Sequence, residues 1–297
     1  MEQIFTEEVT GASLEFVIQN EEAYITGCHI KESRLEIPER LAGMDVTGIA
    51  KKAALSNKIL KELVIPETIR EIGDWAFAHC SRLKEVRMPR KAIWFGKGVF
   101  KDCKELTYIS FTGEDNKKLF ALLAAVPVML EAEYLLSPME AGERVWLQKL
   151  DARLLALLQK PDKEGYSRQV LCGEEDLMAS LEVYLSDRRK QKARLCYLRL
   201  LNDIALEKDL ENLLKTYLKE NTKGCDYEAA WEVVLKENGT NQEYYRVFTE
   251  AGCVTEENFD ALLFDMGERY PDMKAYLLRY KEQNMEDSDF FAGLSLD

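Results

Sequence analysis

The chain has 297 residues, which is enough for two domains, and 46% of them are hydrophobic, which is enough to bury a core in each. Its 7 Pro and 16 Gly argue against long disordered stretches, and no run of about 18 apolar residues predicts a membrane span. The formal net charge of −13 is uneven, because residues 31–111 hold 16 Lys and Arg against 11 Asp and Glu, so that the remainder carries −18.

The start of the chain indicates no export signal, because the first twenty residues lack both a basic start and an apolar run. The seven cysteines are odd in number and contain no Cys-x-x-Cys spacing, so we expect reduced thiols in a cytoplasmic protein. Only two histidines are present, His29 and His79, so the sequence predicts no metal site and no bound cofactor.

The first predicted element is a β-hairpin. Phe16 and Ile18 precede the polar residues 20–22, and Tyr24 and Ile25 follow them. A pattern of this kind is typical of two paired strands joined by a tight turn.

A repeat of 23 residues follows. The segment LKELVIPETIREIGDWAFAHC, from residue 60, matches LKEVRMPRKAIWFGKGVFKDC position by position, and LTYISF begins a third copy. An earlier copy contains an insertion, because its proline, Pro38, precedes Pro66 by 28 residues. Such a repeat predicts a solenoid, in which stacked coils share one core. Gly73 and Gly96 recur at one position, where we expect a tight backbone turn.

Each coil has apolar positions that predict a core. In L-x-x-V-x-[IM]-P the apolar side chains face inward from a short strand, and the proline ends the strand because it cannot donate to the ladder. Phe77 and Phe100 are expected to stack between coils. Cys80 and Cys103 are expected to occupy a buried ladder, where a thiol is inert.

These residues resemble the BspA-type leucine-rich repeats, whose units read I-x-x-I-G-x-x-A-F-x-x-C-x-x-L-x-x-[IV]-x-[IL]-P. The segment IREIGDWAFAHCSRLKEVRMP reproduces nearly every position. The resemblance covers residues 13–111 and implies that the hairpin caps the solenoid, and that the function is adhesion or protein binding. The chain departs from the pattern at residues 53–55 and 93–95, and we expect the fold to survive both changes.

From residue 116 onward the apolar period changes to about 3.6, which predicts helices. One apolar face runs from Trp146 to Leu158, an acidic start predicts a helix at 174–185, and six further helical segments lie between residues 192 and 283. Thr255 followed by Asn258 predicts no full capping box. We therefore expect an α+β protein with a repeat domain at 1–115 and an all-α domain at 116–297.

The helices between 192 and 283 fall into pairs. Tyr227 and Phe259 are 32 residues apart, and so are Tyr244 and Tyr276, which is similar to ankyrin repeats. An irregular helical bundle or α-solenoid is the alternative. The tail at 286–297 is expected either to dock on a groove or to fray.

No catalytic motif stands out, so we expect a protein that is not an enzyme. The chain contains no G-x-G-x-x-G, no G-x-x-x-x-G-K-[ST] and no G-x-S-x-G. A Cys–His pair would have to join His79 to Cys80 or Cys103, which are expected to be buried. The loop at 171–176 is interpreted as a helix cap.

Three functions compete. The first is a protein–protein interaction scaffold, because repeat folds present extended surfaces to other chains. The second is the binding of nucleic acid or another acidic ligand, which we do not favour because the rest of the chain is acidic; the third is an uncharacterised enzyme. The second hypothesis would use the basic residues Arg82, Lys84, Arg87, Arg90, Lys91, Lys97, Lys101 and Lys104, with Trp94 and Tyr108 nearby.

The outward side chains of the repeat strands form the candidate binding face. They fall into three columns across the coils: Lys61, Lys84 and Thr107; Glu62, Glu85 and Tyr108; Val64, Arg87 and Ser110. Neighbouring strands are about 4.8 Å apart, so the columns make one small surface. Two interpretations stay open: the face binds a partner protein, or it packs on the acidic helices of the same chain.

Overall fold

A computed structural model of the chain describes residues 3–166 and 180–285. The chain divides into two compact units, Met1–Leu157 and Leu158–Asp297, which are called the repeat unit and the helical unit below. The strands end and the helices begin near residue 115, as expected, but the first compact unit continues to Leu157. The physical reason is that helix α1 (Lys117–Ala125) packs on the last strand, β11 (Tyr108–Phe111).

The N-terminal end of the repeat unit is the expected hairpin, with one strand more than predicted. Strands β2 (Ala12–Gln19) and β3 (Glu22–Ile30) pair antiparallel through a two-residue turn. Both turn residues, Asn20 and Glu21, are left-handed, as a turn of this length requires. Strand β1 (Ile4–Val9) adds to the outer side of β2, so the cap is a three-stranded antiparallel sheet.

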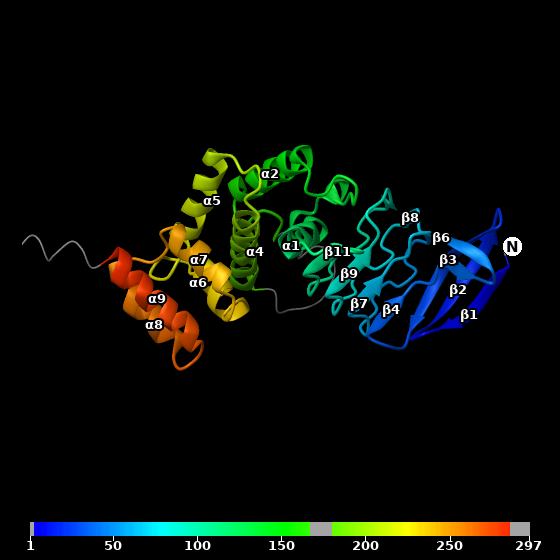
Figure 1. Ribbon diagram of the computed structural model, residues 1–297, viewed down its shortest axis with the longest axis horizontal. Helices are drawn as coiled ribbons and strands as arrows, with labels where there is room; N and C mark the ends of the chain where they lie inside the picture. The colour runs from blue at the N-terminus through cyan, green and yellow to red at the C-terminus, as the bar shows by residue number, and fades with distance from the viewer. Residues whose placement is uncertain (1–2, 167–179, 286–297) are drawn as a thin grey trace, which may run out of the picture. The chain divides into compact units, whose positions relative to one another are not determined.

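The strands form two sheets, and Figure 1 shows the strands following one another along the repeat unit from β1 to β11. The remaining strands are β4 (Arg34–Glu36), β5 (Arg40–Leu41), β6 (Met44–Ile49), β7 (Glu62–Val64), β8 (Glu71–Ile72), β9 (Glu85–Met88) and β10 (Trp94–Phe95). One sheet has the order β1-β2-β3-β6-β8-β10, with β5 paired to β6, and the other has the order β11-β9-β7-β4. Residues 23 apart pair in parallel register, as Leu63 with Val86 and Val86 with Ile109, so the predicted solenoid is confirmed.

The predicted ladders form the core between the two sheets. The rings of Phe77 and Phe100 stack with centroids 6.0 Å apart and an interplanar angle of 19°. The Cys80 thiol donates to the Ala54 carbonyl at 3.3 Å, and the Cys103 thiol donates to the Phe77 carbonyl at 3.2 Å. Both thiols are fully buried, and burial raises the pKa of Cys80 to about 11 and raises that of Cys103 further.

The repeated glycines are not there for the tight backbone turn that the sequence predicts. Neither Gly73 nor Gly96 adopts the left-handed backbone that favours glycine in a tight turn. A Cβ on Gly73 would lie 2.6 Å from the Lys51 amide nitrogen, and one on Gly96 would lie 2.5 Å from the Asp74 amide nitrogen. The glycines therefore allow adjacent coils to approach each other closely.

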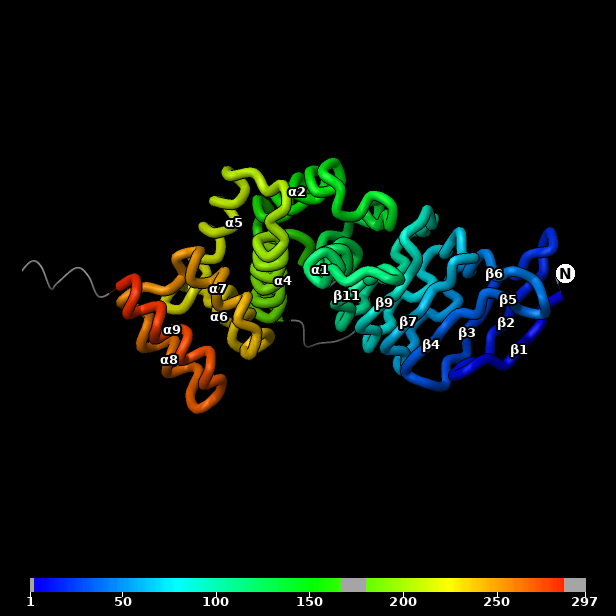
Figure 2. Tube along the Cα trace, in the orientation of Figure 1, coloured from blue at the N-terminus to red at the C-terminus, as the bar shows by residue number. Residues whose placement is uncertain are grey.

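The helical elements follow the expected order, and Figure 2 traces them along the chain. In the repeat unit they are α1, a π-helix at Val126–Leu130, a 3₁₀ turn at Glu133–Leu135 and α2 (Arg144–Gln159), whose last two residues fall beyond the division at Leu157. In the helical unit they are α4 (Leu181–Leu201), α5 (Lys208–Glu220), α6 (Ala229–Glu232) with a π-helix at Val233–Glu237, α7 (Gln242–Glu250), α8 (Glu256–Met266) and α9 (Pro271–Asn284). The core of the helical unit is aromatic, with the rings of Trp231 and Phe248 5.3 Å apart.

Two expectations about the helices need correction. Helix α4 is continuous where two segments were expected, because no Gly or Pro interrupts residues 181–201. Helix α8 does begin with a full capping box, since the Asn258 N–H donates to the Thr255 hydroxyl and the Thr255 N–H donates to the Asn258 side chain. The amide oxygen of Asn258 accepts from the N-cap N–H here, a role that a Glu or Gln side chain usually has in a capping box. The predicted helix start at 174–179, the loop at 171–176 and the tail at 286–297 lie outside the described residues.

Within residues 3–166 and 180–285, no helix combines the length and the apolar composition needed to cross a bilayer.

Candidate protein-binding face

The structure brings the predicted face together on the sheet β4-β7-β9-β11. Glu62, Glu85 and Tyr108 are partners across β7, β9 and β11, and so are Val64, Arg87 and Ser110. Ahead of the strands, the Lys84 N–H donates to the Lys61 carbonyl at 2.8 Å and the Thr107 N–H donates to the Lys84 carbonyl at 3.0 Å. All three columns therefore have the expected register.

Strand β4 extends this surface by two residues that the sequence reasoning missed. Arg34 pairs with Glu62 and Glu36 with Val64 across the β4–β7 ladder, and both side chains of β4 are exposed. The insertion in the first coil hid them, although Leu35, two residues before Ile37 and Pro38, matches the strand motif of later coils. The outward side chains of β4, β7, β9 and β11, together with Lys61, Lys84 and Thr107, are called the strand face below.

Ser110 is wrongly placed in the predicted face. Its side chain is 7% exposed, and its hydroxyl donates to the Glu85 carboxylate at 3.0 Å. The reason is that β11 is the last strand and α1 packs against it, with the rings of Phe111 and Phe120 in edge contact at 5.8 Å. Val64 is half-buried, whereas Tyr108 is 39% exposed.

Charged side chains on β4, β7 and β9 of the strand face pair with one another. The Arg34 guanidinium lies 3.1 Å from the Glu62 carboxylate and 3.5 Å from that of Glu36. The Arg87 guanidinium lies 3.2 Å from the Glu85 carboxylate. Exposed pairs of this kind add little to stability, so their main effect is to leave these two arginines and three glutamates with a net charge of only −1 on the sheet that carries the ring of Tyr108.

The residues of the nucleic-acid hypothesis do not all lie on one surface. Arg90 lies over the Phe111 ring at 4.6 Å and pairs with Glu114, so it holds the end of the repeat unit. Trp94 is on β10 and Tyr108 is on β11, which belong to different sheets. The two exposed aromatic side chains therefore cannot serve a single stacking platform.

The thiols and the acidic clusters do not assemble reactive chemistry in the part of the chain that the structure describes. The His79 imidazole is 3.5 Å from the Asp102 carboxylate on the surface, while the neighbouring Cys80 thiol points into the core. Burial raises the pKa of Cys28 to about 12, so this thiol too stays protonated at neutral pH. Among the described residues, no three His, Cys, Asp or Glu side chains are gathered so as to hold a metal ion.

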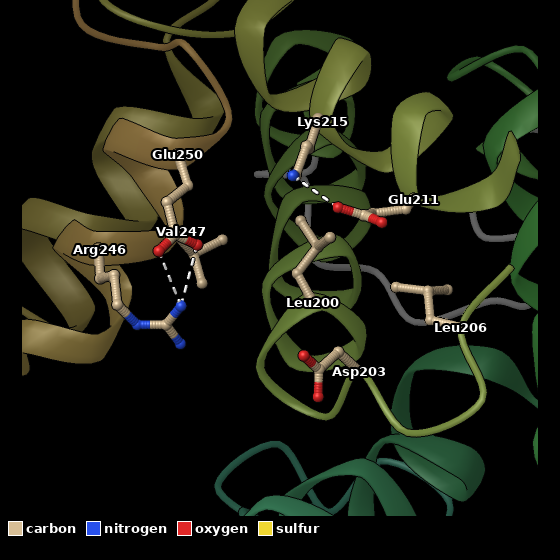
Figure 3. A pocket seen from close by; sticks show the side chains of 8 residues that line it. All are labelled: Leu200, Asp203, Leu206, Glu211, Lys215, Arg246, Val247 and Glu250. Carbon is tan, nitrogen blue, oxygen red and sulfur yellow. Dashed lines mark hydrogen bonds and ion pairs between the residues drawn. The ribbon is translucent and has the colours of Figure 1, made fainter. Parts of the chain in front are cut away.

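A small groove in the helical unit is the second candidate, and Figure 3 shows the side chains that line it. Its volume is about 160 Å³, and its lining residues are Leu200, Asp203, Leu206, Glu211, Lys215, Arg246, Val247 and Glu250. Lys215 is 2.6 Å from Glu211, and Arg246 is 2.9 Å from Glu250. Because four of its five charged side chains pair with one another, the groove offers less for a ligand than the strand face does.

Comparison with protein families decides the nature of the coils. The family described as "BspA type Leucine rich repeat region (6 copies)" matches residues 45–120. Residues 45–120 are a BspA-type leucine-rich-repeat region. The resemblance read from the sequence is thereby confirmed for the coils, and the match extends through β11 into α1. No curated protein matches the chain.

Three solved structures of leucine-rich-repeat proteins are similar to part of the chain. A leucine rich cell surface protein of Faecalibacterium prausnitzii A2-165 is 24% identical over 36% of this chain and 32% of its own, with a TM-score of 0.32. A leucine-rich repeat protein of Bacteroides capillosus is 25% identical over 34% of this chain and 78% of its own, with a TM-score of 0.31. A leucine-rich repeat protein of T. pallidum is 21% identical over 35% of this chain and 49% of its own, with a TM-score of 0.32. The chain thus spans about a third of the F. prausnitzii protein.

Proposed function

We propose that the chain is a non-catalytic scaffold that binds another protein through the strand face. The observation that carries the proposal is Tyr108, whose ring is 39% exposed on a strand whose other face is buried. No core position requires an aromatic residue there, and Tyr is enriched where proteins bind other proteins. Leucine-rich repeats commonly mediate protein–protein interaction, which supports the same function.

The form of the surface also supports a protein partner. The columns of four parallel strands give a rigid platform, and rigid side-chain positions lower the entropy cost of binding. The strands of the platform carry ion-paired side chains with a net charge of −1 and one exposed aromatic ring, which is closer to the anchor of a protein interface than to a phosphate-binding surface. The alternative, that the face packs on the acidic helices of the same chain, is an outcome of the test below.

Two finer features belong to this proposal. Spacing of 32 residues between helical pairs supports an ankyrin-like arrangement of residues 192–283, which would give the scaffold a second repeat surface. Helices α8 and α9 are in contact, since the Lys281 ammonium lies over the Phe259 ring, 4.7 Å from its centroid. The cytoplasmic location expected from the sequence stays a prediction.

Photo-crosslinking from the face tests the proposal. A benzophenone amino acid in place of Tyr108 should capture the partner in the native cell, whereas the same group in place of Trp94 should not. Trp94 is the matched control, because it is 60% exposed but lies on the other sheet. Equal capture from both positions would contradict the proposal. Capture of helical-unit peptides of the same chain from position 108 would show instead that the face is an internal interface.

Substitution separates binding from stability. Arg87→Ala and Tyr108→Ala should lower partner capture and leave the melting temperature almost unchanged, because both side chains are exposed. A fall in melting temperature that disappears in high salt would indicate an ion-paired internal contact instead.

A further inference from the structure

We infer that the strand face recognises an acidic, extended segment of its partner, and that a row of cations beside the strands holds its carboxylates. This inference rests on the proposed function, and it names the chemistry of the partner. The row, called the cationic rim, lies immediately before β7, β9 and β11 and consists of Lys58, Lys61, Arg82, Lys84 and Lys104.

The rim is continuous along the stack of coils. The main-chain ladder places Lys61, Lys84 and Thr107 on three successive coils, one above another. The Lys58 ammonium donates to the His79 carbonyl at 3.1 Å, so this side chain reaches along the stack to the next coil. The three coils span about 10 Å at the usual strand spacing, and alternate residues of an extended peptide, about 7 Å apart, can place carboxylates along that length.

The rim holds spare positive charge. One carboxylate, that of Glu105, approaches it, at 3.7 Å from the Lys84 ammonium. For Lys61, Arg82 and Lys104, the described residues supply no carboxylate within ion-pairing distance, and Arg82 and Lys104 are exposed. The strands themselves differ, because Arg34 on β4 and Arg87 on β9 are already paired. A partner with carboxylates beside the rim and an apolar residue over Tyr108 matches both halves of the surface.

A polypeptide fits these observations better than a nucleic acid does. Stacking of bases needs several exposed aromatic rings, and Tyr108 is the only large aromatic side chain exposed on this sheet within the described chain. The net charge of −13 repels a dense polyanion at long range, whereas a short acidic segment meets mainly the local field of the rim.

The test uses the full chain and a fluorescein-labelled peptide of twelve glutamates, with binding followed by fluorescence anisotropy at about 50 mM and about 250 mM salt. The rim variant carries Lys61→Gln, Arg82→Gln and Lys104→Gln. The control carries Lys51→Gln, Lys97→Gln and Lys117→Gln, which are exposed residues of the same unit and are not members of the rim. Both variants have the same net charge. Three modest exposed ion pairs predict that the rim variant binds about ten-fold more weakly, while the control stays within about two-fold of the unmodified chain.

Three results would overturn the inference. The first is that the unmodified chain fails to bind the peptide at low salt. The second is that both variants lose affinity equally, which indicates general charge attraction. The third is that a twelve-nucleotide oligothymidylate binds more tightly than the peptide and is released by the rim substitutions, which indicates a nucleic-acid ligand. Melting temperatures of both variants verify their folding. If Tyr108 crosslinking still captures a protein while any of these results holds, the proposed function survives and the acidic partner does not.

Discussion

Buried thiols in the repeat unit link its stability to pH. Cys80 and Cys103 occupy equivalent positions on successive coils, and each donates to a main-chain carbonyl of the coil before it. A thiolate in that place would lose more from dehydration than it would gain from the Lys58 ammonium, which is why burial raises both pKa values. These side chains act as small apolar residues, and their chemistry is suppressed by the packing that the repeat imposes.

The folded protein should lose stability as pH rises above about 8.5, the usual pKa of an unfolded thiol. The pKa of Cys80 is about 11 in the folded state, so the unfolded chain loses this proton first and high pH favours unfolding. Between these two pKa values the loss approaches about 1.4 kcal/mol per pH unit for each such thiol. Urea unfolding at pH 8 and pH 10 under reducing conditions measures it. In Cys80→Ala the slope should be smaller, and an unchanged slope would show that this thiol does not contribute.

At the scale of the elements, the coil depends on how closely it meets its neighbours. Gly73 and Gly96 lie where the main chain of one coil closely approaches that of the next. The positions with a left-handed backbone recur at the same 23-residue spacing but are occupied by other residues. Lys52, Trp75 and Gly98 form one such row, and Ser56, His79 and Asp102 form another. The turn therefore tolerates side chains, and the contact between coils does not.

Gly73→Ala should destabilise the repeat unit by about 1–3 kcal/mol, because the new methyl group would press on main-chain atoms that cannot move aside easily. Ser56→Gly is the contrasting change: Ser56 is exposed and left-handed, so removal of its Cβ should be neutral or stabilising by up to about 1 kcal/mol. Denaturant melts of both variants measure the difference. Equal effects would contradict the close-approach explanation.

At the scale of the whole molecule, the repeat unit includes its own C-terminal cap. The cap begins with α1, which buries Leu119, Phe120, Leu122 and Leu123. Arg90 ties it to the last coil by donating to the Ala141 carbonyl at 2.8 Å. An open end of a solenoid exposes apolar side chains and unpaired strand groups, and a capping element removes both.

A fragment of residues 1–157 should therefore unfold cooperatively, and a fragment of residues 1–115 should melt at least about 10 °C lower. The shorter fragment exposes Phe111, which is 1% exposed in the whole chain and accounts for about 1.5–3 kcal/mol by itself. Calorimetry on both fragments tests this expectation. Equal melting temperatures would show that the repeat domain ends near residue 115, as the change of period alone suggested.

Sequence alone determined the coils, their register, the buried Phe and Cys ladders and most of the strand face, because a 23-residue repeat makes equivalent residues neighbours whatever the rest of the chain does. Only the tertiary structure showed that Ser110 is buried, that Arg34 and Glu36 join the face, and that the first unit runs to Leu157. These features depend on contacts between parts of the chain that no period connects. The tertiary structure likewise decided that Arg87 pairs with Glu85, whereas Arg82 and Lys104 keep spare charge, because ion pairing depends on which side chains lie nearby.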